Sequence, residues 1–365
     1  MAQIIIKNLR KDFGNFTAVQ SSSFIIEDGE FFMLLGPSGC GKTTTLRMIA
    51  GLELPTAGEI FIDGEEVSQK RASQRDIAFV FQMFALYPHL NVRQNISYPL
   101  KSEGMKKAQI KIKVAEVAQI LGIEDILNKS VGGLSGGDRQ RVALGRAIVR
   151  EPKAFMMDEP LGALDAEFRE RMSQELRALH DRMGATTVYV THDQLEAMQM
   201  GDKIVVMNHG SVEQFGVPQQ IYDWPATMFV ADFIGSPPMN FLHFSGELAE
   251  GDSSVALNGQ PFDIPRQLQT ASGDLVFGVR PEHVSLDDSS AYMGEVMAVE
   301  YLGTTQIITI ETPNGVLKAR VPAADTIEVG QTVGLAYNSR AITIFDKFSG
   351  VALRSDANKG VLDNG

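Results

Sequence analysis

Cysteine and long apolar segments are what this 365-residue chain has least of. Cys40 is the single cysteine, which excludes an intrachain disulfide and is typical of a protein from a reducing compartment. Apolar runs such as residues 31–35 and 154–157 are short, whereas a membrane-spanning helix needs about 20 residues. The polar N-terminal residues do not resemble a signal peptide. We therefore expect a soluble, cytoplasmic protein that reaches a membrane only through a partner.

Positive charge is also scarce. The chain has 33 Lys and Arg against 45 Asp and Glu, a formal net charge of −12, which argues against a general nucleic-acid binder because such proteins need a basic surface. With 44% hydrophobic residues, a chain of this length can form one large core and a second, smaller one. Two prolines and a glycine in residues 232–242 mark a boundary. We predict domains over residues 1–235 and 236–353, with a flexible tail over 354–365.

Short β-rich runs alternate with helical patterns in the first domain. This alternation predicts a mostly parallel, buried sheet in an α/β domain. Residues 167–183 carry an apolar stripe at helical spacing, so we expect an amphipathic helix packed on that sheet. Beyond residue 235, closely spaced short strands without a long helical period predict a small antiparallel barrel or sandwich. The strands expected in the first domain are residues 31–36, 76–82, 153–159, 186–192 and 203–208.

One segment has the spacing of a phosphate-binding loop. The sequence GPSGCGKTT follows a predicted strand and opens a predicted helix. Backbone N–H groups of such a loop wrap phosphates, Lys42 can reach the β- and γ-phosphates of ATP, and the Thr43 hydroxyl can bind Mg²⁺. Cys40 lies inside the loop, and we expect no chemical role for its thiol in the mechanism. The candidate ATP-binding residues here are Gly36, Pro37, Ser38, Gly39, Cys40, Gly41, Lys42, Thr43 and Thr44.

Polar residues end three further predicted strands. Asp158 and Glu159 close one strand, and His192 and Gln82 close two others. Ligands of open α/β sheets bind outside the carboxyl ends of the strands, so we expect these side chains to lie near Lys42. Asp158, with Gln82, suits Mg²⁺. Glu159 is placed to activate a water molecule.

A second anion site is predicted at residues 134–138, LSGGD. A serine and two glycines open a helix there, and unpaired N–H groups together with the helix dipole favour negative charge at such a position. The chain already has a phosphate loop about a hundred residues upstream. A second anion site is useful if it faces the nucleotide of another copy.

The ordered motifs resemble those of the ATP-binding subunit of ABC transporters. The resemblance implies a P-loop ABC-type ATPase domain with a helical subdomain, a homodimer and the cofactors ATP and Mg²⁺. Glu159 is then the general base, and His192 contacts the γ-phosphate. Phe13 matches the aromatic position that stacks on adenine, although it can also be read as an edge-strand core residue. The resemblance rests on residues 36–44, 79–82, 134–138, 156–160, 161–165 and 190–193.

In that family the signature segment closes over ATP bound to the other subunit. The residues that the resemblance assigns to this role in trans are Ser135, Gly136, Gly137 and Asp138, with Asp165 in an interface loop. Two positions depart from the family pattern. Asp138 replaces the usual glutamine and can accept but not donate a hydrogen bond, and Gly162 stands where serine is common. We expect activity to survive both changes.

The wider resemblance is to the carbohydrate-importer branch of these ATPases. Residues 232–242 and 277–284 resemble landmarks of that branch's C-terminal extension, a small OB-type β domain with regulatory and dimer-stabilising roles. Residues 82–90 resemble the segment that receives two membrane permease subunits. The resemblance thus implies a peripheral protein on the cytoplasmic face of a bacterial inner membrane, working with an extracytoplasmic solute-binding protein and with no nucleic acid. The alternatives left open are importers of non-sugar solutes, soluble ABC ATPases acting on ribosomes or DNA, and an ordinary P-loop kinase.

Overall fold

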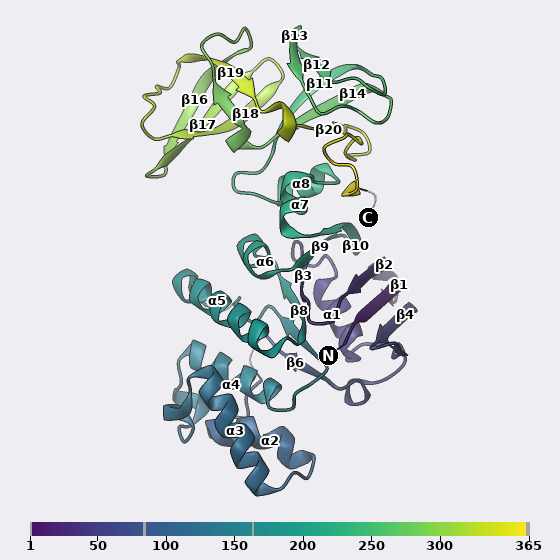
Figure 1. Ribbon diagram of the computed structural model, residues 1–365, viewed down its shortest axis with the longest axis vertical. Helices are drawn as coiled ribbons and strands as arrows, with labels where there is room; N and C mark the ends of the chain where they lie inside the picture. Colours follow the sequence, from purple (N-terminus) through teal and green to yellow (C-terminus); the bar gives the residue numbers. More distant parts are fainter. Residues whose placement is uncertain (1, 83–84, 163, 363–365) are drawn as a thin grey trace. The chain divides into compact units, whose positions relative to one another are not determined.

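The computed structural model describes residues 2–82, 85–162 and 164–362. The chain divides into two compact units, Met1–Pro218 and Gln219–Gly365, whose elements are labelled in Figure 1. Residues 83–84 of the expected permease-docking segment, residue 163 of the 161–165 loop and residues 363–365 of the expected tail lie outside the described residues. In the part of the chain that the structure describes, no helix combines the length and apolar character needed to cross a membrane.

A sheet of order β10-β9-β3-β8-β7-β6 forms the centre of the first unit. Its strand pairs from β9 to β6 are parallel, and β10 adds an antiparallel edge beside β9. Every residue of β3, β7 and β8 is buried, as expected for parallel strands covered on both faces. The prediction of a buried parallel sheet is confirmed. The strands are β3 (Phe31–Leu35), β6 (Ile77–Val80), β7 (Ala154–Asp158), β8 (Thr186–Thr191), β9 (Lys203–Asn208) and β10 (Ser211–Gly216).

A second, antiparallel sheet of order β2-β1-β4-β5 shares an apolar core with the central sheet and with helix α1. Ile4 and Ile60 from this sheet, Leu46 from α1 and Leu34 from β3 are all fully buried in that core. The phosphate loop therefore leads into a helix that is packed firmly at its far end. The elements are β1 (Ile4–Phe13), β2 (Phe16–Ile26), β4 (Ala57–Ile62), β5 (Glu65–Glu66), α1 (Lys42–Ala50), α5 (Ala166–Met183) and α6 (Gln194–Met200), with a 3₁₀ turn η1 (Ala72–Gln74).

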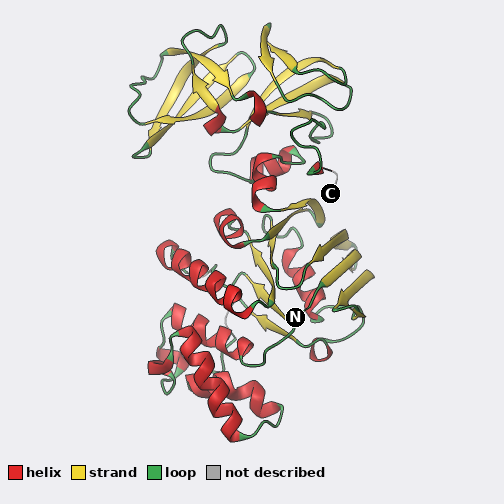
Figure 2. Ribbon diagram, viewed as in Figure 1, coloured by secondary structure: helices red, strands yellow, loops and turns green. Residues whose placement is uncertain are grey.

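Between β6 and β7 the chain forms a helical subdomain, whose helices are red in Figure 2. The Asn91 side chain caps the first helix by accepting from Gln94 N–H. The Gln94 side chain in turn accepts from Asn91 N–H, so the two residues form a capping box. Gly122 ends the second helix in the left-handed conformation. The elements are α2 (Val92–Ser102), α3 (Lys107–Leu121), η2 (Glu124–Ile126), η3 (Val131–Gly133) and α4 (Gly136–Ile148).

The second unit begins with two short helices and continues as antiparallel sheets, which confirms the predicted all-β character. Its sheets have the orders β11-β14-β20, β12-β13 and β15-β19-β16-β17-β18 and share an apolar core, and a smaller apolar cluster joins α8, β14 and β20. The elements are α7 (Pro218–Asp223), α8 (Met228–Phe233), β11 (Asn240–Leu248), β12 (Ser254–Leu257), β13 (Gln260–Asp263), β14 (Ala271–Val279), η4 (Pro281–His283), β15 (Val284–Leu286), β16 (Met293–Tyr301), β17 (Thr305–Thr312), β18 (Gly315–Pro322), β19 (Thr332–Tyr337), η5 (Ser339–Ala341) and β20 (Thr343–Asp346).

Arg280, which directly follows β14, joins that sheet to both short helices. Its guanidinium donates to Tyr222 O at 2.7 and 3.1 Å and to Ile234 O, and it lies 4.0 Å above the Tyr222 ring. The side chain is 1% exposed, and burial lowers its pKa. The described part of the expected tail is also packed: Ser355 and Asn358 are buried, and Ser355 N–H donates to Asn358 Oδ1 at 2.7 Å.

Candidate functional site

The phosphate loop is shaped by glycines that no larger residue can replace. Gly36 and Gly41 have φ angles of 156° and 105°. A Cβ on Gly36 would lie 2.3 Å from Met207 O, and one on Gly41 would lie 2.6 Å from Ala18 O. The backbone of the loop therefore runs against β9 and β2 at a distance that only glycine allows.

The side chain of Lys42 lies inside this loop. Its ammonium donates to Gly36 O at 2.8 Å and to Pro37 O at 2.9 Å, and the residue is 4% exposed. Cys40 Sγ lies 3.9 Å from the same nitrogen, and burial raises the pKa of the thiol. The loop thus holds a buried positive charge among backbone groups, as a site for a polyphosphate requires.

The side chains of Thr43, on α1, and Asp158, the last residue of β7, are in contact. The Thr43 hydroxyl donates to Asp158 Oδ1 at 2.8 Å. Burial raises the pKa of Asp158, while the bond from Thr43 opposes this shift. Within the described ranges no group of three or more His, Cys, Asp and Glu side chains gathers as a metal site. Hydroxyl and carboxylate oxygens suit Mg²⁺, whose remaining ligands can be phosphate oxygens and water.

Three strand-end side chains meet at the carboxylate of Glu159. Glu159 Oε1 lies 3.3 Å from His192 Nδ1, and Glu159 Oε2 accepts from Gln82 Nε2 at 3.4 Å. Gln82 lies two residues beyond β6 instead of ending it, and the contact that the structure records for its side chain is with Glu159. The backbone of Glu159 has φ 44°, held by its N–H donating to Val190 O at 3.0 Å. Non-glycine residues with positive φ cluster at functional sites.

The signature segment begins helix α4. Ser135 is its N-cap, and the hydroxyl oxygen accepts from Asp138 N–H at 3.1 Å. Gly137 packs against the ring of Phe168 on α5, where an added Cβ would lie 1.9 Å from Cζ. Asp138 lies 3.8 Å from Arg141. Gly136 also approaches this region, since its Cβ would lie 3.5 Å from Leu164 Cδ2.

The remaining two predicted site residues lie elsewhere in the first unit. Asp165 caps α5, its Oδ1 accepting from Phe168 N–H at 2.9 Å. Phe13 ends β1 in the antiparallel sheet and is 47% exposed, with Lys11 Nζ 4.8 Å from the centre of its ring. The ring is thus accessible from solvent.

Sequence reasoning missed the support that the β9–β10 turn gives to the phosphate loop. Gly210 N–H donates to Cys40 O at 3.0 Å, and Gln20 N–H donates to Gly210 O at 2.8 Å. The glycine between two short strands does signal a hairpin. It does not signal which loop the hairpin contacts.

Arginines of α4 and of the residues directly after it make contacts within the first unit. Arg141 pairs with Glu175 at 3.2 Å, and Arg150 pairs with Glu103 at 3.0 Å. Arg146 donates to Ala85 O at 2.6 Å and lies 5.2 Å from the centre of the Tyr87 ring. This helix therefore contacts the segment expected to receive membrane partners.

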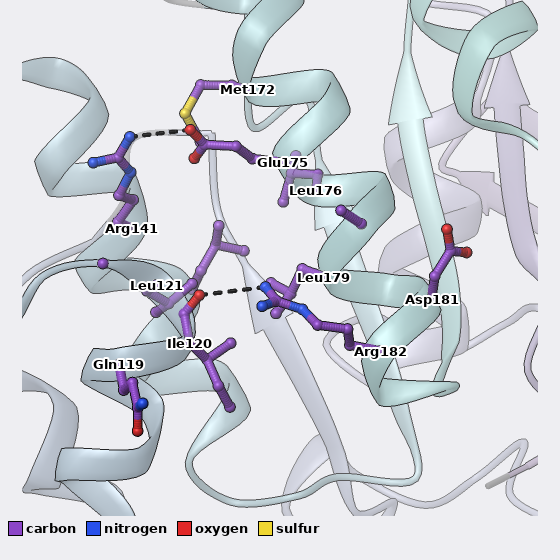
Figure 3. Close-up of a pocket in the computed structure, with 13 residues that line it drawn as sticks. Gln119, Ile120, Leu121, Arg141, Met172, Glu175, Leu176, Leu179, Asp181 and Arg182 are labelled. Carbon is purple, nitrogen blue, oxygen red and sulfur yellow. Dashed lines mark hydrogen bonds and ion pairs between the residues drawn. The ribbon is translucent and has the colours of Figure 1, made fainter.

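A cavity of about 640 Å³ lies between the helical subdomain and α5 (Figure 3). Two contacts cross the cavity: Arg141 pairs with Glu175 at 3.2 Å, and Arg182 donates to Ile120 O at 3.3 Å. Its lining is mainly apolar, with the side chains of Leu144 and Leu176 among those that form it. A triphosphate needs the amides and buried ammonium of the phosphate loop, so we assign the nucleotide to the loop and not to this cavity.

Family models match most of the chain. Residues 19–162 match the ABC transporter model, residues 235–284 the MalK OB fold domain and residues 277–345 the TOBE domain. Solved structures agree over the first unit. A dimeric ATP-binding cassette in a post-hydrolysis state, bound to ADP and Pi, is 33% identical with a TM-score of 0.53, covering 59% of this chain and 98% of that one.

Relatives match along nearly their whole length. The trehalose/maltose import ATP-binding protein MalK of Thermococcus litoralis is 44% identical, over 97% of this chain and 100% of the relative. The trehalose import ATP-binding protein SugC of Mycobacterium tuberculosis is 44% identical over 97% and 98%. The sn-glycerol-3-phosphate import ATP-binding protein UgpC of Rhodopseudomonas palustris is 45% identical over 95% and 98%.

Proposed function

Because the chain belongs to the ABC transporter family of ATP-binding proteins, we propose that it is the ATP-hydrolysing subunit of a membrane importer for a carbohydrate or a related polar solute. Relatives that match nearly its whole length are import ATP-binding proteins for trehalose, maltose or sn-glycerol 3-phosphate. The observation that carries the proposal is the meeting of Glu159 with His192 at 3.3 Å and of Thr43 with Asp158 at 2.8 Å, in the same unit as a phosphate loop.

The phosphate loop binds the triphosphate. Its N–H groups donate to the phosphates, and the Lys42 ammonium neutralises charge on the β- and γ-phosphates. To do so, Lys42 replaces its hydrogen bonds to Gly36 O and Pro37 O with bonds to phosphate oxygens. Phe13 stacks on the adenine. Thr43, Asp158 and Gln82 would hold Mg²⁺, which would supply positive charge to neutralise the phosphates.

Hydrolysis is a water attack on the γ-phosphorus. Glu159 accepts the water proton as the new P–O bond forms and the bond to ADP breaks. His192, whose Nδ1 faces Glu159, contacts the γ-phosphate through its other ring nitrogen. The protein contributes mainly position and electrostatics, because phosphoryl transfer leaves it little covalent chemistry.

The site is complete only in a two-fold dimer. Ser135, Gly136, Gly137 and Asp138 of one subunit close on the γ-phosphate held by the other, and Asp165 lies in the interface loop. The free N–H groups of the α4 start and its dipole favour that anion. ATP binding then draws the subunits together, and hydrolysis releases them. This is the use for a second anion site in one chain.

In the importer, partner proteins connect the ATPase cycle of this chain to the membrane. Two permease subunits dock near residues 82–90, where Arg146 holds Ala85 and lies against Tyr87. An extracytoplasmic binding protein delivers the solute. The ATPase therefore works at the cytoplasmic face, and the OB-type domain over residues 236–353 regulates it.

The proposal is tested by light scattering after size-exclusion chromatography on Glu159→Gln, with and without Mg-ATP. We expect an ATP-dependent dimer that Ser135→Arg abolishes and that Ser102→Arg, an equal change at an exposed site on α2, preserves. A dimer that persists with Ser135→Arg, or turnover of Glu159→Gln at the wild-type rate, contradicts the proposal. Co-purification with two membrane proteins checks the transport role separately.

A further inference from the structure

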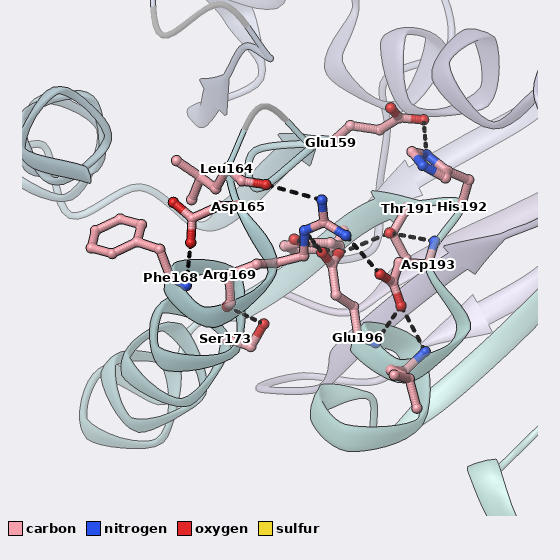
Figure 4. Close-up of polar contacts among 12 residues, drawn as sticks. Glu159, Leu164, Asp165, Phe168, Arg169, Ser173, Thr191, His192, Asp193 and Glu196 are labelled. Carbon is pink, nitrogen blue, oxygen red and sulfur yellow. Dashed lines mark hydrogen bonds and ion pairs between the residues drawn. The ribbon is translucent and has the colours of Figure 1, made fainter. Parts of the chain in front are cut away.

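We infer that Arg169 is a positioning residue that locks the loop after Glu159 to the segment that carries His192. The inference rests on the proposed function, because it concerns the same hydrolytic site. Arg169 belongs to the first turn of α5, which begins directly after the 161–165 loop. Figure 4 shows its guanidinium between that loop and residues 191–196.

Two hydrogen-bond acceptors and one ion-pair partner surround this guanidinium. Nη2 donates to Leu164 O at 3.1 Å, and Nη1 donates to Asp193 Oδ2 at 3.0 Å. Nε lies 3.8 Å from Glu196 Oε1. Leu164 precedes Asp165, and Asp193 follows His192. A single planar side chain thus joins one functional loop to the other, and its fixed fork makes the spacing between them specific.

Buried hydrogen bonds fix the residues that Arg169 contacts in the 191–196 segment. Glu196 Oε2 accepts from Tyr189 O–H at 2.9 Å and from Thr191 O–H at 2.8 Å. Thr191 Oγ1 in turn accepts from Asp193 N–H at 2.9 Å. These groups end β8 and begin α6, so Thr191 is bonded to the Glu196 carboxylate directly and Asp193 is linked to it through Thr191. Glu196 is 5% exposed, and burial raises its pKa.

Asp193 connects this network to the start of α6. Its Oδ1 caps the helix by accepting from Leu195 N–H at 2.8 Å, while Oδ2 takes the bond from Arg169. One carboxylate thus serves the helix cap and the arginine together. A rotation of Asp193 that released Arg169 would also disturb the cap, which makes the linkage stiff.

We expect the loss of Arg169 to impair catalysis more than ATP binding. Glu159 and His192 must keep their 3.3 Å contact while the loop between Glu159 and Asp165 meets a second subunit. None of the three groups that Arg169 contacts belongs to the phosphate loop. Loss of Arg169 should therefore lower kcat and leave KM for ATP nearly unchanged.

Arg177 provides a matched control on the same helix. Its side chain is 31% exposed, against 29% for Arg169, and it pairs with Asp202 at 2.8 Å and Asp181 at 3.0 Å. It also donates to Met200 O at the other end of α6. It therefore loses similar ion pairs when changed, without contacting either functional loop.

The first experiment is hydrogen exchange of Arg169→Met, Arg177→Met and wild-type protein without nucleotide. We expect exchange of amides in residues 159–165 and 191–196 to become at least about threefold faster in Arg169→Met and to stay at the wild-type rate in Arg177→Met, since release of a local contact favours local opening. Arg169→Lys, which can reach fewer acceptors, should fall between the two. Equal exchange of both loops in the two methionine variants overturns the inference.

The second experiment is steady-state ATPase kinetics of the same proteins. Arg169→Met should lower kcat by about tenfold with KM within about twofold, because small displacements of catalytic groups are costly, and Arg177→Met should keep both. If kcat falls equally in both variants, in proportion to the fall in their melting temperatures, Arg169 is only structural. If Arg169→Met does not fold, Glu196→Gln, which keeps an acceptor for Tyr189 and Thr191, is measured in its place. A wild-type protein without ATPase activity counts against the proposed function alone, since the exchange result still decides the role of Arg169.

Discussion

Gly137 and Phe168 are in such close contact that a Cβ on the glycine would lie 1.9 Å from Cζ of the ring. The start of the signature helix therefore rests on α5 at the residue next to Arg169. Three functional segments meet at this first turn of α5: the signature segment, the 161–165 loop and the His192 segment. Their geometry depends on a side chain that contacts no nucleotide in the proposed mechanism.

Gly137→Ala is expected to displace the Phe168 ring and, with it, the start of α4. We predict that ATP-dependent dimerisation in the Glu159→Gln background weakens by at least about tenfold, the effect of a misfit of about 1.4 kcal/mol. Phe168→Leu should restore part of the loss in the double variant, because the shorter side chain leaves room for the methyl group. Dimerisation measured by light scattering checks this. Strictly additive losses from the two changes would contradict the contact as its cause.

Alkylation of Cys40 is expected to block ATP binding. The thiol is 3% exposed and burial raises its pKa, so reaction at neutral pH should be slow and should accelerate as pH rises, because the thiolate is the nucleophile. Mg-ATP should slow it further by occupying the loop. Labelling followed by mass spectrometry gives both rates. A rate that does not change with nucleotide would place the ligand away from the loop.

Arg280→Met is expected to destabilise the second unit by about 2–4 kcal/mol, because several buried carbonyl groups lose their donor. Trp224, the only tryptophan of the sequence, lies between α7 and α8 and reports on this unit by fluorescence. Urea unfolding of the full chain measures the change. The exposed Arg266, changed to Met, is the control and should shift the midpoint little. Equal midpoints for the two variants would disprove the anchoring role of Arg280.

His180 is expected to make the first unit less stable in acid. Burial, followed by the charge of Arg177, lowers its pKa below 6.5, while Asp181 and Asp202 oppose the shift. Since the folded pKa lies below the unfolded one, the unfolded chain binds more protons between these values, and stability falls as pH drops through that window. His180→Gln should remove this dependence, so the stability difference from wild type should shrink from pH about 7.5 to about 5.5. Urea unfolding followed by the helical circular dichroism signal measures it, and a difference independent of pH would refute the assignment.

The five strands expected in the first unit agree with β3, β6, β7, β8 and β9 to within two residues, whereas the apolar runs do not predict β1, β2, β4, β5 or β10. Buried parallel strands are continuous apolar runs, and the polar residues that follow them are the ones that ligands contact. This reasoning predicts that Glu159 and His192 lie close together, and their side chains are 3.3 Å apart. The phosphate loop was found from its spacing, because a glycine-rich turn between a strand and a helix has few other uses.

The supporting contacts could not be predicted in the same way. The helical period showed which face of α5 is buried, and Met172 and Leu176 are indeed buried, but the period does not reveal that Phe168 meets Gly137. Arg169 and Asp193 are 24 positions apart in the sequence, and no local pattern relates them. The bond from Gly210 to Cys40 joins residues still farther apart. Long-range contacts of this kind depend on how the elements pack.

The left-handed backbone of Glu159 lowers the stability of the protein, so stability and ATP turnover favour different residues at this position. At φ 44° a residue with a side chain costs about 1 kcal/mol more than glycine would, and the cost is the same whether or not the carboxylate is used. Glu159→Gly should therefore melt at a higher temperature than the wild type. A laboratory evolution campaign that scored only heat resistance would favour loss of the proposed general base, and the selected variants would be well-folded proteins with little ATP turnover.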